Sequence, residues 1–164
     1  NYFGYNGEER NSGLELNAYA NLMEQTLRPM VSFSFSRAEL NNYTLANGKR
    51  VDGKQQVTSP RFIAKAGVEW DTPFATGLTL NAHLQHYGKS YQNAENSYTL
   101  PGYTTVDLGA KYQSKVAGKD FILRGAVENV FNENYWQIQR GRYDRSFAVV
   151  GLPRTFWLKA TLKL

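Results

Sequence analysis

The sequence contains no cysteine among its 164 residues, so it can form neither a disulfide framework nor a thiolate metal site. It also lacks any run of about 18 apolar residues, which excludes a transmembrane helix. Its only two histidines, His83 and His86, are three positions apart in an extended segment. Side chains alternate along a strand, so these two point to opposite faces and cannot hold one metal ion together. No metal site is therefore expected.

Acidic residues are fewer than basic ones, 14 against 19, which gives a net charge of +5. The basic residues are spread along the chain instead of forming a block, whereas nucleic-acid binders concentrate them on one face. We therefore expect no nucleic-acid partner. Aromatic residues are plentiful at 14%, and tyrosine and tryptophan are typical of strands and of membrane interfaces.

Alternation of apolar and polar residues recurs through the whole sequence. In the last twelve residues, Phe156, Leu158 and Ala160 fall on one face of an extended strand, and Lys159 falls on the other. The same pattern predicts seven strands, at residues 12–22, 28–37, 61–70, 78–91, 103–113, 121–130 and 153–164. Each apolar face runs over about ten residues, long enough to cross a bilayer when the strand is tilted.

The connections between these strands alternate in length. Residues 23–27, 71–77 and 114–120 are short connections, and residues 38–60, 92–102 and 131–152 are long ones. Short periplasmic turns and long extracellular loops are typical of outer-membrane barrels. The sequence thus predicts an all-β protein, an antiparallel transmembrane β-barrel segment of about 7 (possibly 8) strands. A closed antiparallel barrel needs an even number, so either residues 1–5 or 131–152 hide an eighth strand or the chain is part of a larger barrel.

This interpretation predicts the roles of two sets of side chains. Charged residues on the polar face are expected to pair across the wall of the barrel and to keep its lumen polar: Glu15, Lys65, Glu69, Asp107, Lys111, Arg124, Glu128, Lys159 and Lys163. Aromatic residues near strand ends are expected to form the girdles at the membrane surface: Tyr19, Trp70, Phe74, Tyr87, Tyr91, Tyr103, Tyr112, Phe121, Tyr135 and Trp136.

Four segments resemble segments of TonB-dependent outer-membrane receptors, and their order and spacing along the chain match as well. Residues 6–16 (NGEERNSGLEL) are similar to that family's N-G-E-x-R-S-x-G segment, and residues 100–108 (LPGYTTVDL) to its P-x-Y-x-x-x-D-L strand. Residues 128–136 (ENVFNENYW) resemble its V-x-N-L-F block. Residues 151–155 (GLPRT) look like the ferric-siderophore branch of the family. The four segments together with the last strand span nearly the whole chain.

The resemblance implies a location in the outer membrane of a Gram-negative bacterium and a role in the uptake of ferric siderophore, the transported ligand, with no tightly bound cofactor. Such receptors have a barrel of about 22 strands filled by a plug. Residues 1–164 would be the C-terminal portion of that barrel, without the plug. The implied partners are the remainder of the barrel and the plug, TonB through an N-terminal part, outer-membrane lipid and lipopolysaccharide, and the barrel assembly machinery. Leu164 departs from the aromatic residue with which the family usually ends.

The loop of residues 137–150 is the best candidate for contact with such a ligand. Guanidinium groups and aromatic rings lie close together in the sequence here, and they suit an anionic complex with planar groups. The candidate residues are Arg140, Arg142, Tyr143, Arg145 and Phe147, with Tyr135 and Trp136 just before them. Alternatively, these arginines bind lipopolysaccharide phosphates or only solvate the loop. The loop of residues 38–60 is a weaker second candidate.

Two other functional classes remain open from the sequence. One is a small standalone or engineered barrel of about eight strands that performs no active transport. The other is a lipid-modifying membrane enzyme, which would need Ser34 or Ser36, His83 and Asp107 to converge on one wall. Nothing in their spacing supports that convergence, so we expect no catalytic residue and no enzyme.

Overall fold

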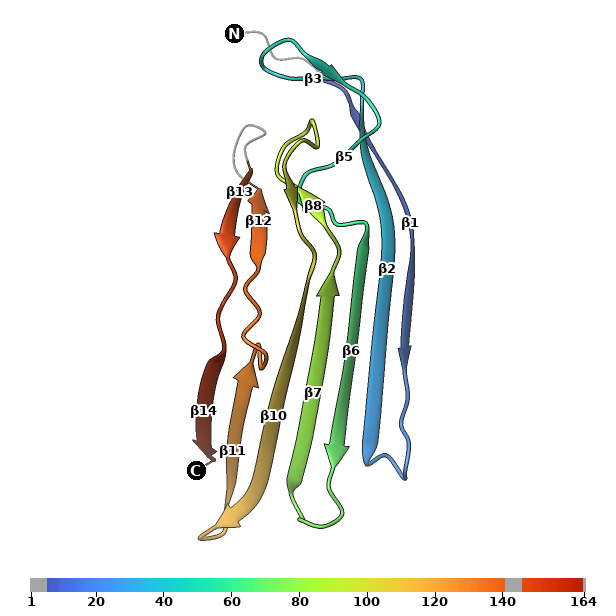
Figure 1. Ribbon diagram of the computed structural model, residues 1–164. Helices are drawn as coiled ribbons and strands as arrows, with labels where there is room; N and C mark the ends of the chain where they lie inside the picture. Colours follow the sequence, from blue (N-terminus) through green and yellow to red (C-terminus); the bar gives the residue numbers. More distant parts are fainter. Residues whose placement is uncertain (1–5, 141–145, 164) are drawn as a thin grey trace.

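A computed structural model describes residues 6–140 and 146–163 of the chain. The regular structure of these residues consists of β-strands, most of them in a single antiparallel sheet. Figure 1 shows the long strands running side by side between two ends of the molecule. Within the described ranges, no helix is long and apolar enough to cross a membrane.

Seven long strands form the sheet in the order β1-β2-β6-β7-β10-β11-β14, each antiparallel to its neighbours. They are β1 (Glu8–Tyr19), β2 (Leu27–Asn41), β6 (Phe62–Asp71), β7 (Leu78–Tyr87), β10 (Tyr103–Val116), β11 (Lys119–Glu128) and β14 (Thr155–Leu162). The prediction of seven long strands is confirmed. β1 and β14 lie at opposite ends of this order, so the described sheet is open and does not close on itself.

Short turns join the strands at one end of the sheet, shown at the bottom of Figure 1. The tightest consists of Ala117 and Gly118 between β10 and β11, both at positive φ (52° and 78°). Such a turn matches the twist of a two-residue hairpin. The other two turns are residues 20–26 and 72–77. The predicted short connections are thus confirmed, and β14 ends at this same end of the sheet.

The long connections at the other end contain short strands of their own. The short strands are β3 (Tyr43–Thr44), β4 (Arg50–Val51), β5 (Lys54–Gln55), β8 (Ser90–Tyr91), β9 (Thr99–Leu100), β12 (Trp136–Arg140) and β13 (Ser146–Val150). The strand expected to run to residue 91 ends at Tyr87, because residues 90–91 turn away to pair with β9. The long loops are therefore built as projecting hairpins.

The register sorts the side chains of the sheet into two faces. Val31, Ala66, Leu84 and Val106 lie opposite one another in one row and therefore point to the same side. On this apolar face large side chains stay uncovered: Leu158, for example, is 75% exposed. A continuous exposed apolar surface of this extent is typical of contact with a partner or a membrane. On a sheet of membrane-crossing length, we assign it to lipid.

The opposite, polar face carries the charged side chains expected there. Of those nine residues, Glu69 is the one that makes an ion pair in the described part of the chain, and its partner is Arg28. The register aligns Lys111, Arg124 and Lys159 with one another, so that like charges, and not opposite ones, are neighbours on these strands. Pairing across the wall of the barrel stays a prediction for the other eight residues, because the opposite wall is not among the described strands.

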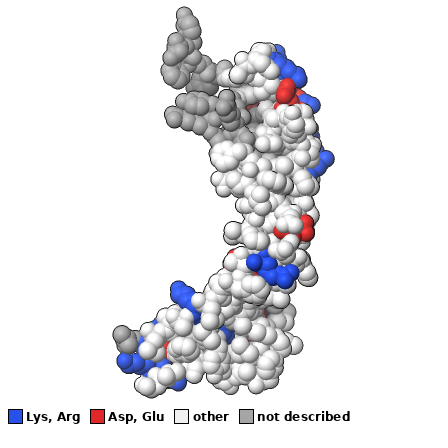
Figure 2. Space-filling model, turned by 60° about the vertical axis from the view of Figure 1, so that its left-hand side comes forward, with Lys and Arg blue, Asp and Glu red and all other residues white. Residues whose placement is uncertain are grey.

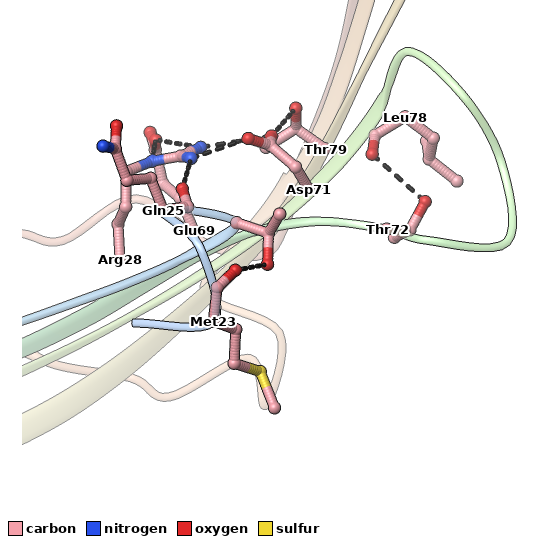
Figure 3. A network of polar contacts seen from close by, with 9 residues as sticks. Met23, Gln25, Arg28, Glu69, Asp71, Thr72, Leu78 and Thr79 are labelled. Carbon is pink, nitrogen blue, oxygen red and sulfur yellow. Dashed lines mark hydrogen bonds and ion pairs between the residues drawn. The ribbon is translucent and has the colours of Figure 1, made fainter. Parts of the chain in front are cut away.

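Arg28 organises the end of the polar face that lies next to the turns (Figure 3). Its guanidinium donates to the Asp71 carboxylate at 2.6 and 3.1 Å, to Glu69 at 3.3 Å and to the Gln25 carbonyl at 2.7 Å. The Thr79 hydroxyl donates to the same Asp71 carboxylate at 2.6 Å. Gln25 closes a turn of three consecutive positive-φ residues. Arg28 therefore ties a strained turn to the neighbouring strand β6, and Thr79 of β7 is linked to it through Asp71.

We expect Arg28→Met to lower the denaturant midpoint of the folded protein, because two carboxylates lose their shared partner and the turn loses a cap. The matched control is Arg10→Met: the Arg10 side chain is 74% exposed, and within the described residues its guanidinium forms an ion pair with Glu8. Exposed pairs of that kind contribute little. Urea titration of both variants measures the difference. Equal midpoints for the two variants would contradict the organising role of Arg28.

The expected aromatic girdle forms only in part. Trp70 and Tyr112 lie on the apolar face near the turns, as predicted, and Phe74 packs edge-on against Trp70 at 5.8 Å between ring centres. Tyr87 and Tyr103 are different: they pair with each other in the rows of Gln85 and Thr105, on the polar face. The prediction that they belong to a lipid-facing girdle is wrong, since each is an odd number of positions from its apolar-face neighbours.

Candidate ligand-binding site at the loop end of the sheet

Asn129 shapes the chain where β11 ends. It is 3% exposed and adopts a positive φ of 51°. Its amide nitrogen donates to the carbonyls of Glu133 at 2.9 Å and Leu152 at 3.0 Å, and its amide oxygen accepts from the Glu133 backbone at 2.8 Å. Its own backbone N–H donates to the Asp107 carboxylate at 2.7 Å. Asn129 therefore fixes both arms of the loop against the sheet.

Asn132 adds a second, more exposed tie between the same two arms. It also has a positive φ, 55°, and its side-chain oxygen accepts from the Arg154 backbone N–H at 2.9 Å. Asparagine is one of the few non-glycine residues that enter this region readily. Asn129 and Asn132 thus have a structural role: they turn the chain so that Tyr135 comes back over the sheet.

Three tyrosine rings from three segments stack on the polar face. Tyr87 of β7 lies against Tyr103 of β10 at 5.1 Å, and Tyr103 lies against Tyr135 of the loop at 4.1 Å, each pair at 22° between ring planes. The Lys65 ammonium lies 5.7 Å from the centre of the Tyr87 ring, and Gln137 hydrogen-bonds to Tyr103. Stacked aromatic pairs add stability beyond their buried area. We call Tyr87, Tyr103 and Tyr135 the tyrosine stack.

Gly151 makes room for the outer ring of this stack. A Cβ atom at Gly151 would lie 2.2–2.5 Å from three ring carbons of Tyr135, closer than real atoms approach. The Gly151 backbone also donates to the Tyr135 carbonyl at 2.8 Å. Burial raises the pKa of the Tyr135 phenol, which lies in the loop between β11 and β12, and the Asp107 charge raises it further. The phenol is therefore protonated at neutral pH.

A hollow of about 290 Å³ lies beside the tyrosine stack, at the end of the sheet that carries the long loops. Tyr87, Tyr103, Trp136, Gln137 and Gln139 line it, together with apolar side chains from β6 and the loops. Aromatic faces, amides and phenols can contact planar ligand groups and accept or donate hydrogen bonds. The hollow can therefore hold part of a small ligand.

The predicted contact residues divide into three groups. Tyr135 and Trp136 meet at this hollow, as part of its stack and of its lining. Phe147 lies on β13 opposite Gln139 and is 51% exposed, so it shares a face with a lining residue. Arg140 ends β12, and its side chain is outside the description. Arg142, Tyr143 and Arg145 lie outside the described residues.

Sequence reasoning missed the roles of Lys65, Tyr87, Tyr103 and Gln137 at this site. The sequence carried a signal for two of them. Tyr87 and Tyr103 lie an even number of positions from Gln85 and Asp107, respectively, which the alternation places on the polar face. Gln137 offered no such signal, because its contact with Tyr103 depends on how the loop folds back.

A larger hollow of about 460 Å³ lies lower on the polar face. Lys65, His83, Gln85 and Asp107 are among its lining residues. His83 faces Asp107 across β7 and β10, but the β2 position in that row is Met30. Ser34 and Ser36 lie further along β2, so the serine, histidine and aspartate of a hydrolase do not come together. His86 points to the apolar face, as its spacing from His83 predicts.

The sequence of this chain matches one protein family, "TonB dependent receptor-like, beta-barrel", over residues 1–130. It is 31% identical over 137 residues to the ferrichrome receptor FcuA of Yersinia enterocolitica, an alignment covering 84% of this chain and 18% of that protein. It is 27% identical over 160 residues to the metal-pseudopaline receptor CntO of Pseudomonas aeruginosa, covering 95% of this chain and 21% of that protein.

A solved structure agrees with these sequence matches. The chain superposes on BauA, the ferric preacinetobactin receptor from Acinetobacter baumannii, with a TM-score of 0.81 and 35% identity. The match covers 96% of this chain and 22% of BauA. The chain belongs to the TonB-dependent receptor β-barrel family, whose members are β-barrels of the Gram-negative outer membrane and act as transport receptors. It spans about a fifth of the length of the curated relatives it matches.

Proposed function

We propose that residues 1–164 form the C-terminal portion of the barrel of a TonB-dependent receptor that takes up a ferric siderophore. The observation that carries the proposal is the construction of the sheet. One face is apolar and exposed, the other is polar, and the loop end carries a hollow lined by Tyr87, Tyr103 and Trp136, beside the tyrosine stack. This is the arrangement of a barrel wall that meets lipid outside and ligand at one mouth.

The remaining strands and the plug would come from sequence outside this chain. In the described structure β1 and β14 each have one neighbour in the sheet. An open edge in lipid leaves backbone groups without hydrogen bonds, which costs several kcal/mol per group. A larger barrel supplies partners for both edges. This reasoning favours it over a small standalone barrel, which would need these two strands to pair with each other.

The ligand would bind at the loop end and pass inward without any tightly bound cofactor in the protein. The tyrosine stack and Trp136 would contact planar groups, and Arg140, Arg142, Tyr143, Arg145 and Phe147 would approach from the β12–β13 hairpin. We further propose that TonB supplies the energy, that lipopolysaccharide surrounds the outer rim, and that the barrel assembly machinery inserts the protein. No step of this role requires catalysis.

Uptake of radioactive iron tests the proposal. Cells that carry the gene for this chain, and cells in which it is deleted, are supplied with iron complexed by ferrichrome, ferrioxamine B or preacinetobactin. We expect uptake of at least one complex to depend on the gene and to stop when the proton gradient is collapsed. Uptake that is unchanged by the deletion for a broad panel of ferric complexes would contradict the transport role.

At the residue level, we expect Tyr135→Ala to weaken ligand binding about tenfold or more, a loss of at least ~1.4 kcal/mol, because an anchor ring and its stack are removed. Tyr135→Phe keeps the stack and is expected to bind nearly as well as the parent. Tyr112→Ala on the apolar face is the matched control. Equilibrium binding to whole cells in the cold measures all three. Parent-like affinity of Tyr135→Ala would remove this tyrosine from the site.

A further inference from the structure

Two carboxylates line one hollow on the polar face, where the long loop after β11 begins. Asp107 of β10 and Glu128 of β11 come directly after the last pair of these two strands, Leu108 and Val127. The hollow has a volume of about 270 Å³, and these two acids line it together with Gln85, Thr105 and Tyr135, among others. Like charges that face each other across strands are destabilising. A cation in the hollow would remove this repulsion.

No base of the described residues neutralises the two acids. None of the seven ion pairs there includes either carboxylate. The Lys65 ammonium lies instead 5.7 Å from the centre of the Tyr87 ring. His83 is directly opposite Asp107, but its Nδ1 lies 2.8 Å from the place of a Cβ atom at Gly67, on the side of β6. The two negative charges therefore remain uncompensated within this part of the chain.

The bases further along β10 and β11 lie nearer the turns. Lys111 and Arg124 are opposite each other, and the row between them and the two acids holds Gly109 and Ala126. Figure 2 shows Lys and Arg gathered at the lower left of the molecule, the end at which β14 finishes. Negative charge at the root of the loop is thus separated from positive charge at the turn end of the sheet.

Unused oxygen atoms surround the hollow. Asp107 accepts through one oxygen from the Asn129 backbone at 2.7 Å, and Glu128 accepts through one oxygen from the Trp157 indole at 3.1 Å. The second oxygen of each has no hydrogen-bond partner among the described residues. Thr105 is 8% exposed, and its hydroxyl also lacks a partner there. Since none of these residues has a fully enclosed polar side-chain atom without a partner, the Thr105 hydroxyl is open to the hollow.

We propose that the hollow binds a calcium ion through the side-chain oxygens of Asp107, Glu128, Thr105 and Gln85, with water in the remaining positions. Calcium takes six to eight oxygen ligands in flexible geometry, whereas magnesium requires a near-ideal octahedron. A shell built from strand side chains of different length suits the more tolerant ion. The volume is below the 300–1,000 Å³ typical of pockets for whole small molecules, and it holds an ion with its waters.

The ligand set also indicates how tightly the ion binds. No three or more His, Cys, Asp or Glu side chains of the described residues form a metal-binding group, so neutral oxygens must complete the shell. We expect a Kd of about 0.1–1 mM, as in extracellular calcium modules, and rapid exchange with solvent. The expectation of no metal site concerned histidine and cysteine ligands, and this site uses neither.

A calcium ion at this place would join β7, β10 and β11 beneath the tyrosine stack. Tyr135 and the returning arm at Leu152 line the same hollow, so the ion would fasten the root of the long loop. The site lies wholly within the described residues. It therefore goes beyond the proposed function and does not depend on which ligand is transported.

Equilibrium dialysis of the full protein against radioactive calcium tests the inference. The protein is purified in detergent and washed with EDTA, which removes lipopolysaccharide and its calcium. We expect the parent to bind one equivalent of calcium that the double variant Asp107→Asn, Glu128→Gln does not bind. Both amides keep an oxygen that can accept from Asn129 or Trp157, so the fold is retained. Binding of magnesium at the same site is expected to be at least tenfold weaker.

Glu15→Gln is the matched control. Glu15 lies on the same polar face, opposite Ser34 of β2, and does not line the hollow. This variant loses one carboxylate elsewhere on the face and should bind calcium as the parent does. Thr105→Val is a second test variant, because its hydroxyl has no other contact to lose, and it should weaken binding several-fold.

Four results would overturn the inference. The first is equal calcium binding by the parent and the double variant, with both migrating as heat-modifiable barrels. The second is an equal loss in Glu15→Gln, which would make general surface charge the cause. The third is a folded parent that binds no calcium, as expected if a base from the opposite wall fills the hollow, and the fourth is a preference for magnesium. If the double variant does not fold, parent-like binding by Thr105→Val overturns the inference instead.

Discussion

Val31→Arg is expected to destabilise the folded barrel by about 2–4 kcal/mol, the cost of an arginine on the lipid face near the bilayer midplane. Val31 is 54% exposed on the apolar face, between Ala18 of β1 and Ala66 of β6. It lies four positions along β2 from Leu27, which is paired with Trp70 at the turn-end girdle. An arginine there must reach the headgroups along the surface of the sheet or draw water into the membrane.

Ser34→Arg is the matched control on the same strand. Ser34 lies on the polar face, opposite Glu15 of β1, so the new guanidinium finds water and an acidic neighbour. We expect its stability to stay within about 0.5 kcal/mol of the parent. Urea unfolding in lipid vesicles, followed by heat-modifiable migration, measures both variants. Equal destabilisation by the two arginines, or a larger loss for Ser34→Arg, would mean that the faces are assigned the wrong way round.

Asn129→Ala is expected to cost about 3 kcal/mol of folding stability, because it removes a buried amide and leaves the Glu133 and Leu152 carbonyls and the Glu133 N–H, all partly buried, without their partner. The loop of residues 129–154 would lose its attachment to the sheet. Tyr135 would then leave the tyrosine stack, so ligand affinity should fall together with stability. Unfolding in vesicles and cold binding to whole cells measure the two effects separately.

Asn132→Ala provides the control for this prediction. Asn132 has nearly the same positive φ as Asn129, so the backbone cost of alanine is matched, but its side chain accepts one exposed hydrogen bond, from Arg154. We expect a loss of no more than about 1 kcal/mol and parent-like binding. If the two alanine variants lose the same stability, the backbone conformation and not the buried amide carries the effect.

The alternation of residues was sufficient to predict the sheet. The segments 61–70 and 78–91, for example, became β6 and β7 as paired neighbours, because a period of two specifies both strand and face. The expected strand ends were less accurate. Tyr91 continued the alternating pattern but lies in the β8–β9 hairpin, since the pairing partner that decides where a strand stops is distant in the sequence.

The structure places two of the residues expected at the ligand contact near each other and adds neighbours that the sequence did not indicate. Tyr135 and Trp136 were expected there from their place beside the arginine-rich loop; Tyr135 lies in the tyrosine stack and Trp136 lines the hollow beside it. Tyr87 and Tyr103 were assigned to the membrane girdle from their position at strand ends, although their parity placed them on the polar face. For an aromatic residue at a strand end, its odd or even position along the strand is the stronger signal, because that position decides which face of the sheet the ring lies on.

The charged residues of the polar face show a limit of prediction from sequence. Alternation along the strand predicts which face each charge lies on, but it does not predict which residue the charge pairs with. Lys111, Arg124 and Lys159 could have met acids on neighbouring strands, and the register instead aligned them with one another.

By itself, then, the sequence determined the number of long strands, their two faces and the family, because these depend on local periodicity and on short motifs. Only the tertiary structure decided the register, the tyrosine stack under Gly151, the role of buried Asn129 and the alignment of Lys111, Arg124 and Lys159. Each of these depends on residues far apart in the chain that are brought within a few ångströms by strand pairing. Local patterns carry no information on that distance.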